Sequence, residues 1–121
     1  MIIAVDIDGT LTNETEGHDY ANRTPNMVMI KFVQEAYEAL HSIILWSSRY
    51  EVDRAVTIDW LLKYNIPYSK LILDKLTYDL LIDDKTIPVE QLKTHMENLK
   101  SKEHSNANQE QANNGSGDTR I

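Results

Sequence analysis

The chain has 121 residues, of which 41% are hydrophobic, and a formal net charge of −7. This length supports one hydrophobic core and is too short for two ordinary domains. The absence of cysteine excludes disulfides, thiolate metal ligands and cysteine nucleophiles, so any metal must be held by oxygen or imidazole. The acidic balance argues against a nucleic-acid or anionic-membrane partner, because both require clustered Lys and Arg.

The two ends of the chain set the expected location and domain boundary. The first residues begin a strand pattern instead of a basic stretch followed by a long apolar one, and no run of about 18 apolar residues occurs. We therefore expect a soluble cytoplasmic protein. From about residue 101 the sequence is rich in Asn, Gln, Ser and Gly, which cannot bury enough apolar surface to order the chain. We predict a single working domain over residues 1–100 and a disordered polar tail over 101–121.

The first half of the chain predicts a strand, a helix and a second strand. Residues 2–5 form an apolar run typical of a strand buried on both faces. Thr24 and Pro25 are suited to the N-cap and first position of a helix, and apolar residues then recur at helical spacing as far as Leu40. Residues 42–47 are again a short apolar run that ends in a polar residue, which indicates a second buried strand.

The second half continues the alternation. Residues 52–62 predict a helix that ends before Pro67, because a proline disfavours helix at its predecessor. Short apolar runs predict a third strand over 71–73 and a fourth over 80–82, and a last helix is expected over 88–99. Strands that alternate with helices indicate an α/β fold with a mostly parallel sheet.

Polar residues follow every predicted strand. They are Asp6 and Asp8 after the first, Ser47 after the second, Lys75 after the third, and Asp83 and Asp84 after the fourth. The carboxyl ends of parallel strands lie at one edge of a sheet, where open α/β folds place their chemistry. Two carboxylates about 4 Å apart repel by roughly 4 kcal/mol at an effective dielectric near 20, so four need a compensating cation. Mg²⁺ is the natural candidate, because it prefers hard oxygen ligands.

Each of these residues also has a plainer interpretation. Asp8 could close an Asp-Gly turn with Gly9, Ser47 could cap a strand end, and Lys75 could be a solvated loop lysine. Asp83 and Asp84 could cap the turn before the last helix. Their joint occurrence in this order favours the functional interpretation over four coincidences.

This ordered set resembles the haloacid dehalogenase superfamily of phosphohydrolases. The superfamily pattern is Asp-x-Asp-Gly-Thr, then Ser or Thr, then Lys, then an acidic pair, and it is matched over roughly residues 2–90. A narrower resemblance is to small capsule-polysaccharide-biosynthesis phosphatases. It is carried by residues 19–22 with Pro25, residues 60–62 with 66–68, and residues 82–85. The resemblance implies a Rossmann-like three-layer sandwich with a mostly parallel central sheet and no cap domain.

The resemblance also implies roles for individual residues. Asp6 would attack phosphorus to form an aspartyl-phosphate, and Asp8 would act as acid and base. Ser47 would hydrogen-bond a phosphoryl oxygen, and Lys75 would balance its charge. The implied ligands of Mg²⁺ are Asp83, which we favour as the closer of the acidic pair, Asp84, the Asp6 carboxylate and the Asp8 carbonyl. The candidate substrate-binding residues are Gly9, Thr10, Ser48 and Arg49.

Two of these candidates have alternatives in the surrounding loops. Arg49 could reach an anionic substrate group or pair with Asp53 at the surface. Thr10 could support the Gly9 turn instead of contacting substrate. Residues 18–23 lie where superfamily members carry a flap over the active site, so they could select the substrate or be a solvated loop.

The spacing departs from the superfamily in two places. Only four residues separate Lys75 from Leu80, whereas parallel strands normally need a crossover of a dozen or more. Either residues 71–73 are not a full strand, or an unusually short link crosses the sheet. There is also no room for a cap, so the crevice stays open to a large substrate unless a second subunit of a homo-oligomer closes it.

We therefore expect a Mg²⁺-dependent phosphomonoesterase that acts through an aspartyl-phosphate on a sugar phosphate or a similar small metabolite of polysaccharide biosynthesis. One alternative is a phosphoacceptor domain of the signalling-receiver type, although in receivers the acidic pair comes first in the chain. The other is a non-catalytic binding protein with the same fold, which would have little need of Asp8.

Overall fold

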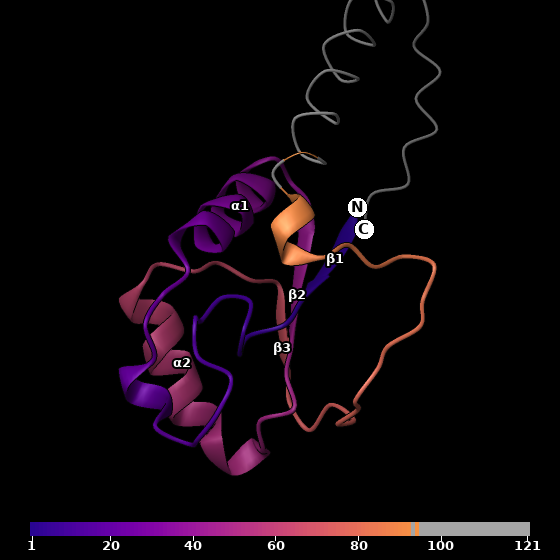
Figure 1. The fold of residues 1–121 in the computed structure, drawn as a ribbon. Coiled ribbons are helices and arrows are strands. Elements are labelled where there is room, and N and C mark those ends of the chain that lie inside the picture. Colours follow the sequence, from indigo (N-terminus) through magenta and orange to yellow (C-terminus); the bar gives the residue numbers. More distant parts are fainter. Residues whose placement is uncertain (93, 95–121) are drawn as a thin grey trace, which may run out of the picture. The chain divides into compact units, whose positions relative to one another are not determined.

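The computed structural model describes residues 1–92 and 94. Its centre is a parallel three-stranded sheet in the order β1 (Ile2–Val5), β2 (Ser42–Trp46) and β3 (Lys70–Ile72) (Figure 1). The register pairs Val5 with Leu45, and Trp46 with Ile72. The prediction of an α/β fold with a parallel sheet is confirmed.

Two helices complete the packed side of the sheet. They are α1 (Met27–Glu38) and α2 (Arg54–Lys63), and both are drawn on the same side of the strands in Figure 1. Side chains alternate across a strand, and on β2 Ile43 and Leu45 are fully buried whereas Trp46 is 42% exposed. Within residues 1–79 no element forms the third layer of the expected sandwich.

The two tryptophans differ in burial. Trp60 of α2 is buried. Trp46 is exposed, because it points from the end of β2 to the open face of the sheet.

Helix α1 begins later than its sequence predicted. Asn26 is the N-cap, and its side chain accepts a hydrogen bond from the amide of Met29 at 3.3 Å. Thr24, the expected cap, instead donates its hydroxyl to the carboxylate of Glu14 at 2.7 Å. Pro25 forms an isolated antiparallel bridge with Thr12. Thr24 and Pro25, which precede α1, therefore anchor the loop that follows β1.

The described chain divides into two compact units, one over residues 1–79 and one that starts at Leu80. The predicted strand at 80–82 is wrong, because these residues have no strand structure and their side chains are exposed. The physical reason is the short connection from β3, which is far below the length of an ordinary parallel crossover.

The second unit contains one short element within the described residues. A 3-10 turn, η3 (Val89–Gln91), follows Pro88 at the start of the predicted last helix. The remainder of that helix and the tail predicted over 101–121 lie outside the described residues. In the described part of the chain, no helix is long and apolar enough to cross a membrane.

Candidate active site

The turn after β1 is built around Gly9. The amides of residues 10, 11 and 12 all donate to the carbonyl of Ile7, at 3.1, 2.8 and 3.1 Å. Gly9 has φ +77°, and its amide donates to the carbonyl of Glu14 at 3.1 Å. A Cβ atom at Gly9 would lie 2.6 Å from the methyl of Thr15. The glycine is therefore required sterically as well as by its backbone angle.

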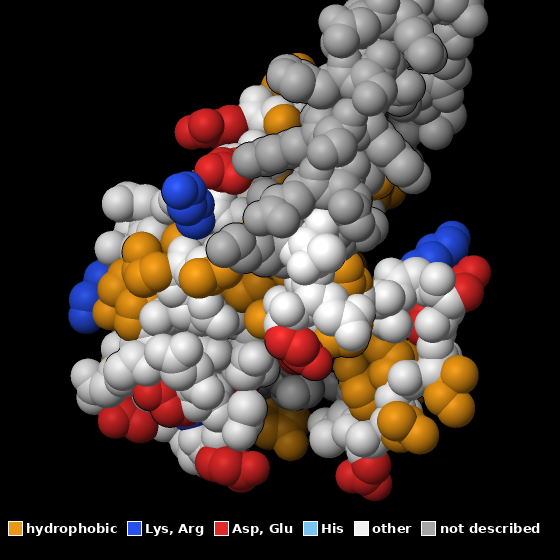
Figure 2. Space-filling view, turned by 45° about the horizontal axis from the view of Figure 1, so that its top comes forward, with side chains coloured by type: hydrophobic (Ala, Val, Ile, Leu, Met, Phe, Trp, Pro, Cys, Tyr) orange, Lys and Arg blue, Asp and Glu red, His pale blue; other side chains and the backbone are white. Residues whose placement is uncertain are grey.

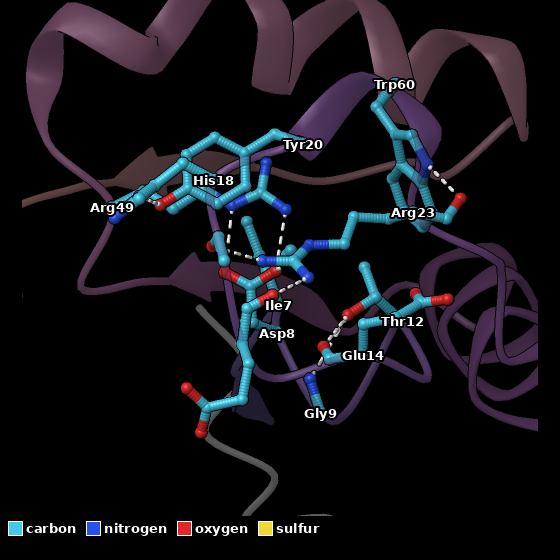
Figure 3. A network of polar contacts seen from close by, with 12 residues as sticks. Ile7, Asp8, Gly9, Thr12, Glu14, His18, Tyr20, Arg23, Arg49 and Trp60 are labelled. Atoms are coloured by element: carbon cyan, nitrogen blue, oxygen red, sulfur yellow. Dashed lines mark hydrogen bonds and ion pairs between the residues drawn. The ribbon is translucent and has the colours of Figure 1, made fainter.

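The Asp8 carboxylate is held by two arginines (Figure 3). Arg49 donates to it through both arms of its guanidinium, from Nε to Oδ2 at 2.9 Å and from Nη2 to Oδ1 at 2.7 Å. The Nε of Arg23 lies 3.4 Å from Oδ1. The Arg49 side chain is 1% exposed and that of Asp8 20%. Fork-like pairs of this kind are the strongest and most directional carboxylate contacts, so the orientation of Asp8 is tightly defined.

Arg49 is in turn fixed by α2 and by an aromatic ring. Its Nη1 donates to the hydroxyl of Thr57 at 3.0 Å, and that hydroxyl donates to the carbonyl of Asp53 at 2.8 Å. The ring of Tyr20 covers the guanidinium, with 4.0 Å between the ring centroid and Cζ. Arg49 is therefore buried, and its carboxylate partner is Asp8 rather than the Asp53 considered from the sequence.

The loop between β1 and α1 is organised around Arg23. Its Nη1 and Nη2 donate to the carbonyls of Glu16 and Gly17, and its own carbonyl accepts from the indole of Trp60 at 3.0 Å. The Nε of Arg23 is buried without a hydrogen-bond partner in the described part of the chain. This N–H group of Arg23 lies beside the Asp8 carboxylate without forming a hydrogen bond to it.

Hydrogen bonds between Glu14 and Thr24 connect the two ends of the same loop. The carboxylate of Glu14 accepts from both the amide and the hydroxyl of Thr24, at 2.8 and 2.7 Å. These bonds lower the pKa of Glu14. Within the loop, Nδ1 of His18 lies 3.1 Å from the hydroxyl of Tyr20. The segment considered from the sequence as a flap is thus an ordered loop that carries Tyr20 and Arg23 to Asp8.

Asp6 has a different environment from Asp8. It accepts a hydrogen bond from the amide of Ile7 at 2.8 Å. Burial raises the pKa of Asp6, and the charge of Lys75 partly offsets this effect. The Asp8 carboxylate is therefore paired with guanidinium groups, whereas the Asp6 carboxylate is desolvated. Unequal environments of neighbouring carboxyl groups are typical of sites where they have separate chemical roles.

The ends of β2 and β3 meet beside Asp6. The amide of Ser47 donates to the carbonyl of Ile72, and the carbonyl of Ser47 accepts from the amide of Lys75, both at 2.9 Å. The hydroxyl of Ser47 is buried and accepts from the amide of Arg49 at 3.1 Å. Asp6, Asp8, Ser47 and Lys75 accordingly lie at one edge of the sheet. Ser48 is exposed and Thr10 is half-buried in the Gly9 turn.

The predicted acidic pair lies in the second unit. Asp83 and Asp84 are exposed, and Oδ1 of Asp83 accepts from the amide of Lys85 at 3.0 Å. This bond lowers the pKa of Asp83 and matches the turn-capping alternative for the pair. Across residues 1–92 and 94, no three His, Cys, Asp or Glu side chains gather in a way that could hold a metal ion.

The arginines are the part of this site that sequence considerations missed. Arg23 was noted only as a loop residue, and Arg49 only as a group for substrate or Asp53. A buried arginine is unusual unless it is paired, and Arg49 lies 41 positions after Asp8 in the sequence. The one available signal was the position of Arg49 two residues after the strand-end Ser47.

Comparison with known proteins defines the class of fold. No family model matches the sequence, and no curated protein matches it. A structural-genomics target from Vibrio cholerae has a similar structure, with 22% identity and a TM-score of 0.64 over 74% of this chain and 85% of that one. Its likeness shows that the α/β fold is shared.

Two chains from structures of the Pnkp1/Rnl/Hen1 RNA repair complex are also similar. Both are 27% identical, with TM-scores of 0.53 and 0.54 over 60% and 69% of this chain. The matched regions are 24% and 30% of those longer chains. The protein is thus an α/β unit with a parallel sheet whose acidic and basic side chains gather at the carboxyl edge.

Proposed function

We propose that the chain is a phosphomonoesterase of the haloacid dehalogenase type that uses Mg²⁺ and an aspartyl-phosphate intermediate. The observation that carries the proposal is the contrast between the two carboxylates after β1, one desolvated at Asp6 and one gripped by Arg49 at Asp8. The sugar phosphate or similar metabolite of polysaccharide biosynthesis that we propose as substrate rests on the narrower sequence resemblance.

Asp6 is the proposed nucleophile. A carboxylate oxygen of Asp6 forms a bond to phosphorus as the bond from phosphorus to the leaving oxygen breaks. Burial supports this role, because a poorly solvated carboxylate gives up less hydration on attack. In the second step a water oxygen attacks the same phosphorus, and the Asp6 carboxylate is released.

Asp8 is the proposed acid and base. It gives a proton to the leaving oxygen in the first step and takes one from water in the second. Both of its oxygens already accept bonds from Arg49, so a proton on either oxygen displaces one N–H contact. The buried, unpartnered Nε of Arg23 supports the return to the ionised state, because it supplies a further donor beside Oδ1.

Ser47 and Lys75 are proposed to bind the phosphoryl group. The oxygen of the Ser47 hydroxyl already accepts from the backbone, which leaves its proton for a phosphoryl oxygen. The ammonium of Lys75 acts on Asp6 electrostatically, so it is close enough to balance charge that develops there.

The donors for Mg²⁺ in this proposal are all oxygens, which is the chemistry that the ion prefers. The sequence resemblance implies that they are the Asp6 carboxylate, the Asp8 carbonyl, Asp83 and Asp84. When bound, the ion would neutralise charge on the transferring phosphoryl group. Replacing Asp83 or Asp84 with Asn should raise the Mg²⁺ concentration needed for half-maximal activity, whereas Asp59→Asn on the exposed face of α2 should not.

The direct test is release of phosphate from p-nitrophenyl phosphate by the purified chain with and without Mg²⁺. We expect Mg²⁺-dependent turnover that Asp6→Asn abolishes and Asp59→Asn retains. An inactive wild type, or an Asp6→Asn variant at the wild-type rate, would contradict the proposal. A long-lived phospho-aspartate after acetyl phosphate treatment, without turnover, would indicate the receiver-type alternative.

A further inference from the structure

The ammonium of Lys75 lies against two aromatic rings. Its Nζ is 4.7 Å from the ring of Trp46 and 5.1 Å from the ring of Tyr78, and it donates to the Tyr78 hydroxyl at 3.3 Å. These distances are in the range of cation–π contacts, which are weak at exposed positions. Lys75 therefore rests between the two rings while it remains the cation that most strongly affects Asp6.

Trp46 lies at the end of the strand that neighbours the candidate nucleophile. The register pairs Val5 of β1 with Leu45 of β2, so the next residues in the same register are Asp6, directly after β1, and Trp46, the last residue of β2. Val5 and Leu45 are buried, and alternation along a strand directs the next side chains toward the opposite face of the sheet. Trp46 thus flanks the position where a phosphoryl group bound to Asp6 would carry its organic part.

Both rings are exposed to an unusual degree for this position. Trp46 and Tyr78 are each 42% exposed, whereas Trp60 is 2% exposed. Large aromatic side chains left in solvent beside polar, chemically competent groups are typical of binding surfaces. Hydrophobic side chains, drawn in orange, are visible at the surface in the view of Figure 2.

We propose that Trp46 and Tyr78 form an aromatic subsite that stacks on a ring carried by the phosphomonoester substrate. This inference rests on the proposed function, because the phosphate at Asp6 brings the ring to the subsite. A phosphate oxygen offers Lys75 a charge-assisted hydrogen bond, which is stronger than its contacts with the two rings. Lys75 turns to the phosphate, and the faces of Trp46 and Tyr78 that it leaves stack on the ring of the substrate.

A ring face is the chemistry recognised here, and it can belong to a nucleobase or to a sugar. The test uses the Asp6→Asn variant, so that binding is measured without turnover. Its ligands are a nucleoside 5′-monophosphate, a hexose 6-phosphate and the acyclic glycerol phosphate. Only two tryptophans are present in the sequence, and Trp60 is buried, so ligand-dependent fluorescence would report on Trp46.

We expect at least one ring-bearing ligand to quench this fluorescence and to bind about tenfold more tightly than glycerol phosphate, the contribution of one stacked ring. The ligand that binds more tightly, the nucleoside 5′-monophosphate or the hexose 6-phosphate, shows whether the subsite recognises a nucleobase or a sugar ring. Tyr78→Leu should remove most of that preference, measured as the ratio of the affinity for the ring-bearing ligand to the affinity for glycerol phosphate. Tyr37→Leu is the matched control, because Tyr37 is also 42% exposed but lies on α1. Trp46→Leu removes the fluorescent reporter, so the affinity of this variant for the same ligands is measured by calorimetric titration.

Equal affinity for cyclic and acyclic ligands, no measurable binding of any of them, or a preference that survives both Leu substitutions would overturn the subsite. These outcomes are separate from the test of the proposed function. A ring preference in a chain that does not hydrolyse p-nitrophenyl phosphate supports the subsite and contradicts the reaction. Hydrolysis of p-nitrophenyl phosphate without a ring preference supports the reaction and contradicts the subsite.

Discussion

Replacing Arg49 tests the central contact of the site. Arg49→Ala removes two hydrogen bonds to Asp8 and one to Thr57, from a guanidinium that is almost completely buried. Loss of one partner of a buried ion pair costs about 3–5 kcal/mol. Because Asp8 is 20% exposed and keeps Arg23 at 3.4 Å, we expect a loss of about 2–4 kcal/mol in the free energy of unfolding.

Urea denaturation followed by circular dichroism measures this loss. Arg54→Ala is the matched control, because the pair of Arg54 with Glu51 is exposed and should contribute little to stability. A double-mutant cycle of Arg49→Ala with Asp8→Asn should give a coupling energy above about 1 kcal/mol. If Arg49→Ala costs no more than Arg54→Ala, or if the coupling is near zero, the pair does not organise the site.

Arg49→Lys separates charge from geometry. Lysine keeps the positive charge but cannot bond both carboxylate oxygens through a rigid fork. We expect this variant to recover part of the stability lost in Arg49→Ala and to leave the rate of phosphate release well below that of the wild type. Full recovery of the rate would show that charge alone is sufficient at this position.

Two further predictions concern the β1 turn and the pH dependence of stability. Gly9→Ala should destabilise the chain by about 1 kcal/mol more than Gly17→Ala in urea denaturation, because both have positive φ but only at Gly9 would a Cβ meet another atom, the methyl of Thr15; equal losses would contradict the steric argument. Burial raises the pKa of Asp6 above 3.8 in the folded chain, so the ionised carboxylate costs stability above that raised value, and the cost disappears as pH falls through it. Asp6→Asn should therefore raise the urea midpoint at pH 7 and have little effect near pH 4, and a midpoint lowered at pH 7 would refute this sign.

Local sequence patterns were sufficient for the parts of the fold that depend on nearby residues. The apolar run at 2–5 and the glycine at position 9 predicted a strand followed by a sharp turn, because an apolar run and a positive φ are properties of a few consecutive residues. The expected burial of this strand on both faces was wrong, because Ile2 and Ala4 are exposed. The polar residues at the ends of β2 and β3 could be assigned to the same edge as Asp6 for a similar reason, since parallel strands align their carboxyl ends.

Other features depended on how distant segments meet. The predicted strand at 80–82 has the right composition, but a strand also requires a connection long enough to return the chain to the sheet, and the link from Lys75 is short. Trp46 is a large apolar residue at the end of an apolar run, as core residues often are. It is nevertheless exposed, because within residues 1–79 the helices pack on one face of the sheet only.

The sequence by itself determined which carboxylates stand at the end of β1 and which strand ends accompany them. Only the tertiary structure decided how those carboxylates differ. Arg49 reaches Asp8 across 41 residues, and Arg23 is held against it by a loop closed through Glu14. Charge pairing between distant segments leaves no periodic trace in a sequence, because each residue is placed by its own element and the two meet only when those elements pack.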